Sequence, residues 1–389
     1  MASRQSLWSK IGAGLLLLVV VLAALPALTG NQYIYRAFRA TYLQGHDTAN
    51  IDDGAVFDQH LVKAGAPQPW PLAPDYNRVP LSTALLAHHA QFGTAAWLVI
   101  HRGQVLQERY FAPYTANSRT NSFSVAKTVT TMLVGAAVAD RYLLSFDEPV
   151  ADFIPEYLPD PRASRATFAH FSSMSSGQRW TENYHLPLNP TAKLYYGDDA
   201  AAVVLTTGFD HDPGQEYAYG SASTQVIGIA LQRALARKTP GLTLAQYLSD
   251  KFWKPLGMSR DAFWTMDRPE GVEKTFCCLY ATARDYAKLG QLLLQGGQWQ
   301  GKSLLDAGFV ARMSQPDLQP FYGHSLWMDQ TYAHPFYLFQ GHLGQYIIVV
   351  PDKQLVVVRL GRQRATDKAG GVLPREVYGF VDAAVALVP

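Results

Sequence analysis

Residues 121–130 read NSFSVAKTVT, and a hydroxyl and an amine stand there at the start of an apolar segment. The segment that follows, TMLVGAAVADRYL, has the apolar spacing of a buried helix. Ser124 and Lys127 are three positions apart, so their side chains face the same side of that helix. Removing both groups from water costs free energy, so their position at a buried helix calls for a chemical reason.

Acyl transfer would supply that reason. A serine hydroxyl is a poor nucleophile, and a lysine that burial holds partly neutral can take its proton. The unpaired N–H groups at a helix N-terminus favour an anion and lower the pKa of a nearby amine. The Ser-x-x-Lys spacing is weak evidence by itself, because a helix-capping Ser124 beside an exposed Lys127 would give the same pattern.

A second stretch, DPGQEYAYGSASTQVIGIALQ, places Tyr219 and Ser221 just ahead of another predicted helix. A tyrosine near a lysine ammonium can become a phenolate or relay a proton, which would let it protonate a leaving group. The alternative is that Tyr217 and Tyr219 are ordinary strand aromatics and that Ser221 caps the helix.

A third stretch, FQGHLGQYIIVVP, has Gly341 and Gly344 on either side of His342 at the start of a predicted strand. Glycines there would let a substrate approach the backbone. The Gln345 N–H could then join the Ser124 N–H in an oxyanion hole. The alternative is a plain turn that leads into a core strand.

The motifs SVAK, YGS and HLG, in this order on helix, loop and strand, resemble those of the serine β-lactamase and penicillin-binding-protein superfamily. The resemblance is nearer to the class C β-lactamase branch and its relatives, the esterases and 6-aminohexanoate-dimer hydrolases. It runs from about Leu81 to the C-terminus. Further stretches that fit this branch are RYLLSFDEPVADFIPEYLP, FSSMSSGQRW, PGQEYAYGS, ATARDYAKLGQLLLQGGQW and VVPDKQLVVVRLG.

The resemblance implies catalytic roles for the residues of the first two motifs. Ser124 would be the nucleophile, Lys127 the amine that helps to deprotonate it, and Tyr219 a general base or acid. Ser221 stands where the family usually has Asn or Ser, and it would bind substrate or orient Lys127. Whether Lys127 or Tyr219 takes the first proton stays open, because the two would titrate as a coupled pair.

The third motif bears on the substrate. His342 and Gly344 match the family's Lys-Thr-Gly or His-x-Gly strand, and Gln345 would give the second oxyanion amide. A lysine in this motif helps to hold a substrate carboxylate, whereas a histidine with its ordinary pKa of about 6.5 is largely neutral at pH 7. An obligatory anionic β-lactam is therefore less expected than a small ester or amide.

Several other residues are weaker candidates for the substrate pocket. Aromatic side chains are more often buried in the core than placed in a pocket, and polar side chains are more often exposed at the surface. The aromatic candidates are Trp180, Tyr195, Tyr196 and Trp327, and the polar ones are His185 and Asp198.

The order of elements predicts an α+β fold. LSTALLAHHAQFG reads as a helix and TAAWLVIHRGQVLQERYF as a hairpin, while the chain ends in two strands and a helix. We expect these terminal elements to share one antiparallel sheet flanked by the N- and C-terminal helices. Residues 76–389 form the predicted hydrolase domain, with an α-rich insertion at about 145–300. Residues 31–75 read as an N-terminal extension.

Residues 1–30 are predicted to be a cytoplasmic stub and a transmembrane anchor. The stretch from Ile11 to Gly30 carries no charge, and about 20 apolar residues are what a membrane-spanning helix needs. A cleavable signal would have a shorter apolar core. Arg4 and Lys10 precede the span, which points to a cytoplasmic N-terminus. The catalytic domain would then lie outside the cytoplasm, on the periplasmic side.

Composition excludes some partners and cofactors. Its 33 Lys and Arg against 31 Asp and Glu give a net charge of +2, so no nucleic acid partner is expected. No metal-ligand spacing or phosphate loop is present, and we expect no cofactor and no metal. The adjacent Cys277 and Cys278 cannot form a relaxed disulfide, so they are expected to be small buried residues rather than a redox pair.

The leading hypothesis is thus a membrane-anchored serine hydrolase that forms an acyl-enzyme. One alternative is a cell-wall enzyme, either a D,D-peptidase or a β-lactamase. The other is a non-catalytic binding module on the membrane, because a fold does not fix a function.

Overall fold

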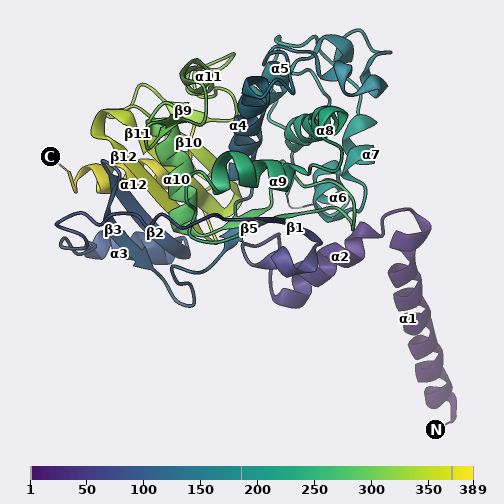
Figure 1. Ribbon diagram of the computed structural model, residues 1–389. Helices are drawn as coiled ribbons and strands as arrows, with labels where there is room; N and C mark the ends of the chain where they lie inside the picture. The colour runs from purple at the N-terminus through teal and green to yellow at the C-terminus, as the bar shows by residue number, and fades with distance from the viewer. Residues whose placement is uncertain (1, 185, 369–370, 389) are drawn as a thin grey trace.

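The computed structural model describes residues 2–184, 186–368 and 371–388 (Figure 1). Its main sheet has six antiparallel strands in the order β3-β2-β12-β11-β10-β9. The first and last strands of the domain therefore share one sheet, as predicted. The strands are β2 (Thr94–His101), β3 (Gln104–Tyr110), β9 (Trp327–Asp329), β10 (Phe336–Gly341), β11 (Gln345–Val350) and β12 (Leu355–Gly361).

Both faces of this sheet are buried, which explains the apolar run Leu355–Val358 of β12. Leu355 and Val357 belong to one core cluster with Phe380 of α12 (Arg375–Val385). Val356 and Val358 point to the opposite face and join the larger cluster. Burying a valine contributes about 1.5–3 kcal/mol, so a one-residue slip in register would lose stability on both faces.

Helices cover the two faces (Figure 1). α12 and α3 (Thr83–Gln91) lie on one face, while α4 (Val125–Ala139) and α10 (Ala283–Leu294) lie on the other. Gly290 lets α10 pack closely, because a Cβ there would come within 2.7 Å of the Ile347 side chain. The predicted α+β fold, an antiparallel sheet flanked by the N- and C-terminal helices, is confirmed.

A second sheet joins the predicted N-terminal extension to the domain. Its order is β1-β5-β6-β4, with β1 (Gln59–Val62), β4 (Thr120–Asn121), β5 (Ala262–Thr265) and β6 (Leu279–Ala281). Asp53 of the extension is buried and accepts hydrogen bonds from the hydroxyls of Tyr195 and Tyr280, at 2.9 Å and 2.5 Å. The extension is therefore built into the folded body.

In the region predicted as an α-rich insertion, most of the regular structure is helical, and the region also contributes β5 and β6 to the second sheet. Two outlying elements, β7 and β8, form a small hairpin. The remaining elements are α5 (Phe168–Ser172), α6 (Pro190–Tyr196), α7 (Ala200–Leu205), α8 (Ser221–Lys238), α9 (Leu244–Leu248), β7 (Gln298–Trp299), β8 (Lys302–Ser303) and α11 (Ala307–Met313).

The N-terminal helix α1 (Ala2–Leu28) projects from the body (Figure 1). Its segment Lys10–Leu28 is exposed along its length and is long and apolar enough to cross a membrane. The amphipathic helix α2 (Tyr33–Ala40) follows within a few residues and packs against α6.

Cys277 and Cys278 are buried, as predicted, but the structure joins them in a disulfide, which sequence analysis did not predict. Cys278 has a φ of 72°, a left-handed conformation that the sequence pattern does not reveal. The turn brings the two neighbouring sulfur atoms together.

Candidate active site

Ser124 lies at the N-terminal end of α4, where its hydroxyl is free of any capping role. It occupies the N-cap position with φ −65° and makes no side-chain cap hydrogen bond. Phe123 before it has a φ of 44°, in the left-handed region that non-glycine residues rarely adopt. Such strain is typical of functional sites. The interpretation of Ser124 as a simple helix cap is therefore wrong.

Lys127 is buried, with only 1% of its surface exposed. Its Nζ donates hydrogen bonds to Ser124 Oγ at 3.0 Å, to Ser221 Oγ at 3.1 Å and to the carbonyl of Phe276 at 2.9 Å. Burial lowers the pKa of Lys127 to about 8, and the charge of Glu182 partly opposes this. A measurable fraction of the amine is therefore neutral near pH 7, as a general base requires.

The loop that carries Tyr219 is held to the segment before it by backbone hydrogen bonds. Asp210 N–H donates to Gly177 O at 2.9 Å, and Ala218 N–H donates to Met174 O at 2.8 Å. Gly177 is required there, because a Cβ would come within 2.1 Å of the His211 carbonyl oxygen. These contacts fix the backbone on the approach to Tyr219.

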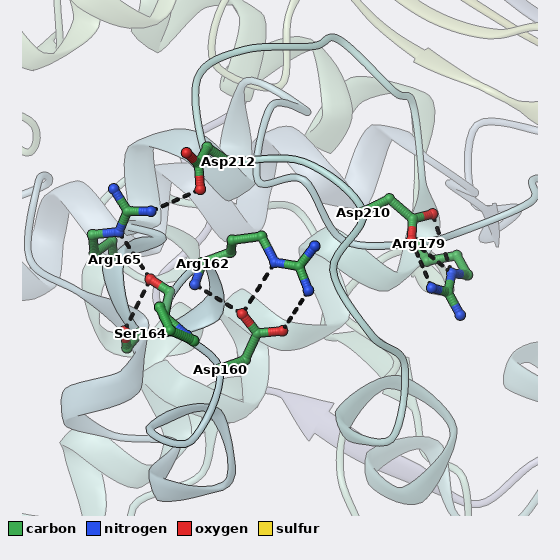
Figure 2. Close-up of polar contacts among 8 residues, drawn as sticks. Asp160, Arg162, Ser164, Arg165, Arg179, Asp210 and Asp212 are labelled. Atoms are coloured by element: carbon green, nitrogen blue, oxygen red, sulfur yellow. Dashed lines mark hydrogen bonds and ion pairs between the residues drawn. The ribbon is translucent and has the colours of Figure 1, made fainter.

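Two surface ion pairs also join the segment around Asp210 and Asp212 to earlier parts of the chain (Figure 2). Arg179 pairs with Asp210, and Arg165 pairs with Asp212, as Figure 2 shows. Because these side chains are well exposed, solvent screens them and they add little stability. They link residues 210–212 to Arg165 and Arg179 at the protein surface.

Tyr219 faces both members of the Ser-x-x-Lys pair. Its ring centroid lies 5.3 Å from Lys127 Nζ, and it lines the same cavity as Ser124. Burial and the charge of Glu182 raise the pKa of Tyr219, although the Ser124 side chain and the Arg364 charge oppose the rise. The phenol is therefore protonated at neutral pH and can donate a proton.

Glu182 is a member of the site that sequence analysis missed. Its Oε1 accepts hydrogen bonds from Ser221 Oγ at 2.6 Å and Tyr184 OH at 2.5 Å. Its Oε2 accepts from Ser221 N–H at 2.9 Å and Trp180 Nε1 at 2.7 Å. A lone carboxylate within the aromatic run RWTENY was the available signal. Ser221, at the start of α8, thus links Lys127 to Glu182.

His342 begins the short helical turn η7 (His342–Gly344) between β10 and β11. Its ring stacks on Tyr184, with centroids 4.8 Å apart, and meets the edge of Phe123 at 5.3 Å. His342 therefore lies beside the nucleophile, as the motif predicts.

The glycine and glutamine of the third motif serve packing. A Cβ on Gly344 would come within 2.1 Å of the Arg359 guanidinium, so its absence makes room for this side chain. Arg359 is fully buried and donates to the carbonyls of Leu343 and Gly344 at 3.2 Å and 2.8 Å. The side chain of Gln345 donates to the carbonyls of His342 at 3.0 Å and Gly361 at 2.7 Å.

Two cavities meet at Ser124. The smaller, of about 50 Å³, has a mainly apolar wall that includes Tyr195, Tyr196, Phe276 and Cys277. The larger, of about 330 Å³, is lined by Glu182, Tyr219, Trp327, Gln340, His342 and Arg364, among others. The nucleophile thus stands between an apolar pocket and a more polar cleft.

The weaker candidates for the substrate pocket lie in different parts of the structure. Tyr195 and Tyr196 line the smaller cavity, and Trp327 lines the larger. Trp180 supports Glu182, whereas Asp198 borders a different groove near α2. His185 lies outside the described residues. Among the residues that the structure describes, no group of three or more His, Cys, Asp and Glu side chains could hold a metal ion.

Comparison with known proteins assigns the chain to a family. The Beta-lactamase family model matches residues 82–377, which is more than half of the chain. The chain therefore belongs to the β-lactamase family of serine hydrolases, as the motifs predict.

Individual relatives share its fold. A 6-aminohexanoate-dimer hydrolase of Paenarthrobacter ureafaciens is 27% identical over 230 residues, which are 56% of each protein. The match thus spans little more than half of this curated relative. A Bacillus anthracis protein named after the same hydrolase superposes with a TM-score of 0.72 at 20% identity, over 91% of this chain and 94% of that chain. A family VIII carboxylesterase gives a TM-score of 0.60 at 17% identity, over 82% and 99%.

Proposed function

We propose that the chain hydrolyses a small ester or amide through an acyl-enzyme on Ser124. The observation that carries this proposal is the 3.0 Å hydrogen bond between Lys127 Nζ and Ser124 Oγ, made by a buried lysine with a lowered pKa. The relatives named as a dimer hydrolase and a carboxylesterase support the same chemistry.

Lys127 acts as the first base in this scheme. As neutral amine, it accepts the Ser124 proton while Oγ attacks the substrate carbonyl. The N–H groups of Ser124 and Gln345 would stabilise the oxyanion. Tyr219 remains protonated at neutral pH, because burial raises its pKa, and it protonates the leaving group. Water then attacks the acyl-enzyme and gives its proton to the Tyr219 phenolate, the acid leaves, and Ser124 recovers its proton from the Lys127 ammonium.

The two cavities suggest how the substrate lies. The acyl group enters the apolar pocket beside Phe123 and Tyr195, and the leaving group occupies the cleft with Tyr219. Gln340 Oε1 also lines that cleft, and it is a buried acceptor with no hydrogen-bond donor among the described residues. The N–H of an amide leaving group would supply one.

Intact-mass analysis tests the proposal against both alternatives. The full chain is incubated with a neutral fluorophosphonate and separately with a penicillin, with Ser124→Ala as control. Labelling at Ser124 by the fluorophosphonate alone supports the esterase or amidase. A stable penicilloyl adduct would favour a cell-wall enzyme. A folded protein that neither reagent modifies would leave the binding module as the better explanation.

α1 anchors this enzyme in a membrane, with the body outside the cytoplasm. The Tyr35 hydroxyl donates to Ala23 O at 2.5 Å, five residues before the end of α1. At a rise of 1.5 Å per residue, Ala23 lies about 7 Å inside the membrane end of α1, and the Tyr35 hydroxyl lies at the same depth. The helix α2 would therefore lie in the headgroup region. Protease protection in spheroplasts, from which the outer barrier has been removed, tests the orientation: a body cleaved only after the spheroplasts are lysed would contradict it.

A further inference from the structure

The backbone turn that presents Ser124 is closed by an asparagine side chain. Phe123, directly before the nucleophile, has its left-handed φ of 44°, and its N–H donates to Asn121 Oδ1 at 2.9 Å. An N–H that donates to an asparagine side chain two positions earlier forms an Asx turn. A left-handed conformation of a non-glycine residue persists only where its surroundings hold it. The orientation of the Asn121 amide therefore bears directly on where Ser124 lies.

A buried carboxylate of the N-terminal extension contacts that amide. Asp53 and Asn121 are both buried. Asn121 Nδ2 donates to Asp53 Oδ1 at 3.4 Å and to the Tyr195 hydroxyl at 3.0 Å. The hydroxyls of Tyr195 and Tyr280 donate to Asp53 in turn. The extension also meets the backbone here, because the Asn121 N–H donates to Ile51 O at 2.9 Å.

The chemistry of Asp53 fixes which way the Asn121 amide faces. Burial raises the pKa of Asp53, while the hydrogen bonds from Tyr280 and Tyr195 favour the ionised form. An ionised carboxylate only accepts hydrogen bonds, so it requires the NH₂ side of the Asn121 amide to face it. The Oδ1 side of the amide must then face the Phe123 N–H.

Resting on the proposed reaction at Ser124, we propose that Asp53 is a positioning residue for the nucleophile. It acts through Asn121, whose Oδ1 holds the Phe123 N–H and with it the backbone that leads into Ser124. Asp53 contributes no atom to the reacting centre. The N-terminal extension is therefore part of the active site as well as part of the fold.

Exchanging the two side chains tests this route on the full-length protein. Asp53→Asn keeps the size of the side chain but lets it donate, so the Asn121 amide is free to turn its NH₂ toward the Phe123 N–H. We expect the rate constant of fluorophosphonate labelling to fall about tenfold to a hundredfold, as a small displacement of a reacting group allows. The double variant Asp53→Asn with Asn121→Asp again pairs one carboxylate with one amide. Its carboxylate at position 121 accepts the Phe123 N–H, so it should recover most of the rate.

The labelled fraction at completion separates positioning from folding. An unfolded fraction does not label, whereas a misplaced Ser124 labels slowly but completely. Asp47→Asn, at an exposed position of the same extension, is the matched control and should keep the wild-type rate. If Asp53→Asn does not fold, Tyr195→Phe removes a single donor to Asp53 and should slow labelling about threefold.

Two results would overturn the positioning role. One is an unchanged rate constant in the Asp53→Asn variant, or a smaller labelled fraction that reacts at the wild-type rate. The other is a double variant that labels no faster than Asp53→Asn alone. A wild-type chain that the fluorophosphonate does not label would instead count against the proposed hydrolase.

Discussion

Ser221 Oγ lies between Lys127 Nζ, at 3.1 Å, and Glu182 Oε1, at 2.6 Å, so the buried amine and the carboxylate are linked through one hydroxyl. Glu182 also raises the pKa of Lys127 through its charge, against the larger effect of burial. The carboxylate thus limits how far the lysine is neutralised.

Substitution of Glu182 tests this link. Glu182→Gln removes the negative charge, so the pKa of Lys127 should fall further and the rising limb of the pH-rate profile should move to lower pH. The plateau rate of fluorophosphonate labelling should fall about tenfold or more, because charge-assisted hydrogen bonds to Ser221 are weakened. Glu270→Gln, at an exposed position, is the control. A limb that stays in place would show that the two groups are uncoupled.

The wild-type enzyme should itself be activated by alkali. Burial lowers the pKa of Lys127 to about 8, so the neutral amine is the minor form at pH 7 and the major form at pH 9. The labelling rate of Ser124 should rise about tenfold per pH unit well below pH 8 and level off above it. The second-order rate constant, measured from pH 6 to pH 9.5, checks this. A flat profile would argue against Lys127 as the base.

Arg359 should be essential to stability. Burial lowers its pKa to about 10, and its guanidinium donates to the carbonyls that shape the His342–Gly344 turn. Arg359→Met would leave these buried acceptors unpaired, and the free energy of unfolding should fall by about 3 kcal/mol. Urea denaturation measures the loss against Arg362→Met as control. A loss under about 1 kcal/mol would mean that water replaces the guanidinium at little cost.

Truncation should show that the extension belongs to the fold. A chain that begins at Asn31 keeps Asp53 and β1, whereas one that begins at Ala66 loses both. The shorter chain exposes the edge of β5 and leaves two buried tyrosine hydroxyls without their acceptor. Its melting temperature should be lower by roughly 10 °C or more. Calorimetry on both chains would reveal equal melting if the extension were only a tether.

The sequence predicted the elements whose pattern is local. The terminal helices, the β2–β3 hairpin around Arg102 and Gly103, and the strands β11 and β12 follow from apolar periodicity and turn residues. The SVAK, YGS and HLG motifs likewise identified side chains that the fold brings around Ser124. These elements could be predicted because the structure of each depends mainly on residues close to it in the sequence.

Features that depend on distant partners were not predictable. Glu182 matters only because α8 brings Ser221 to it. The sequence suggests that Gly344 faces the substrate. In the structure, the Arg359 side chain from the neighbouring strand occupies the space beside its Cα. The disulfide between Cys277 and Cys278 depends on a left-handed turn that no periodicity signals. The strand β1 has its partner β5 some 200 positions away in the chain.

This last pairing bears on how the protein folds. β1 pairs with β5, and β2 pairs with β12 near the end of the chain, so both sheets close over very long stretches of sequence. Loop closure over such distances is entropically costly and makes folding slow. A ribosome must therefore have made nearly the whole polypeptide before the main sheet can form, and α1, as the proposed membrane anchor, would reach the bilayer while the body is still unfolded.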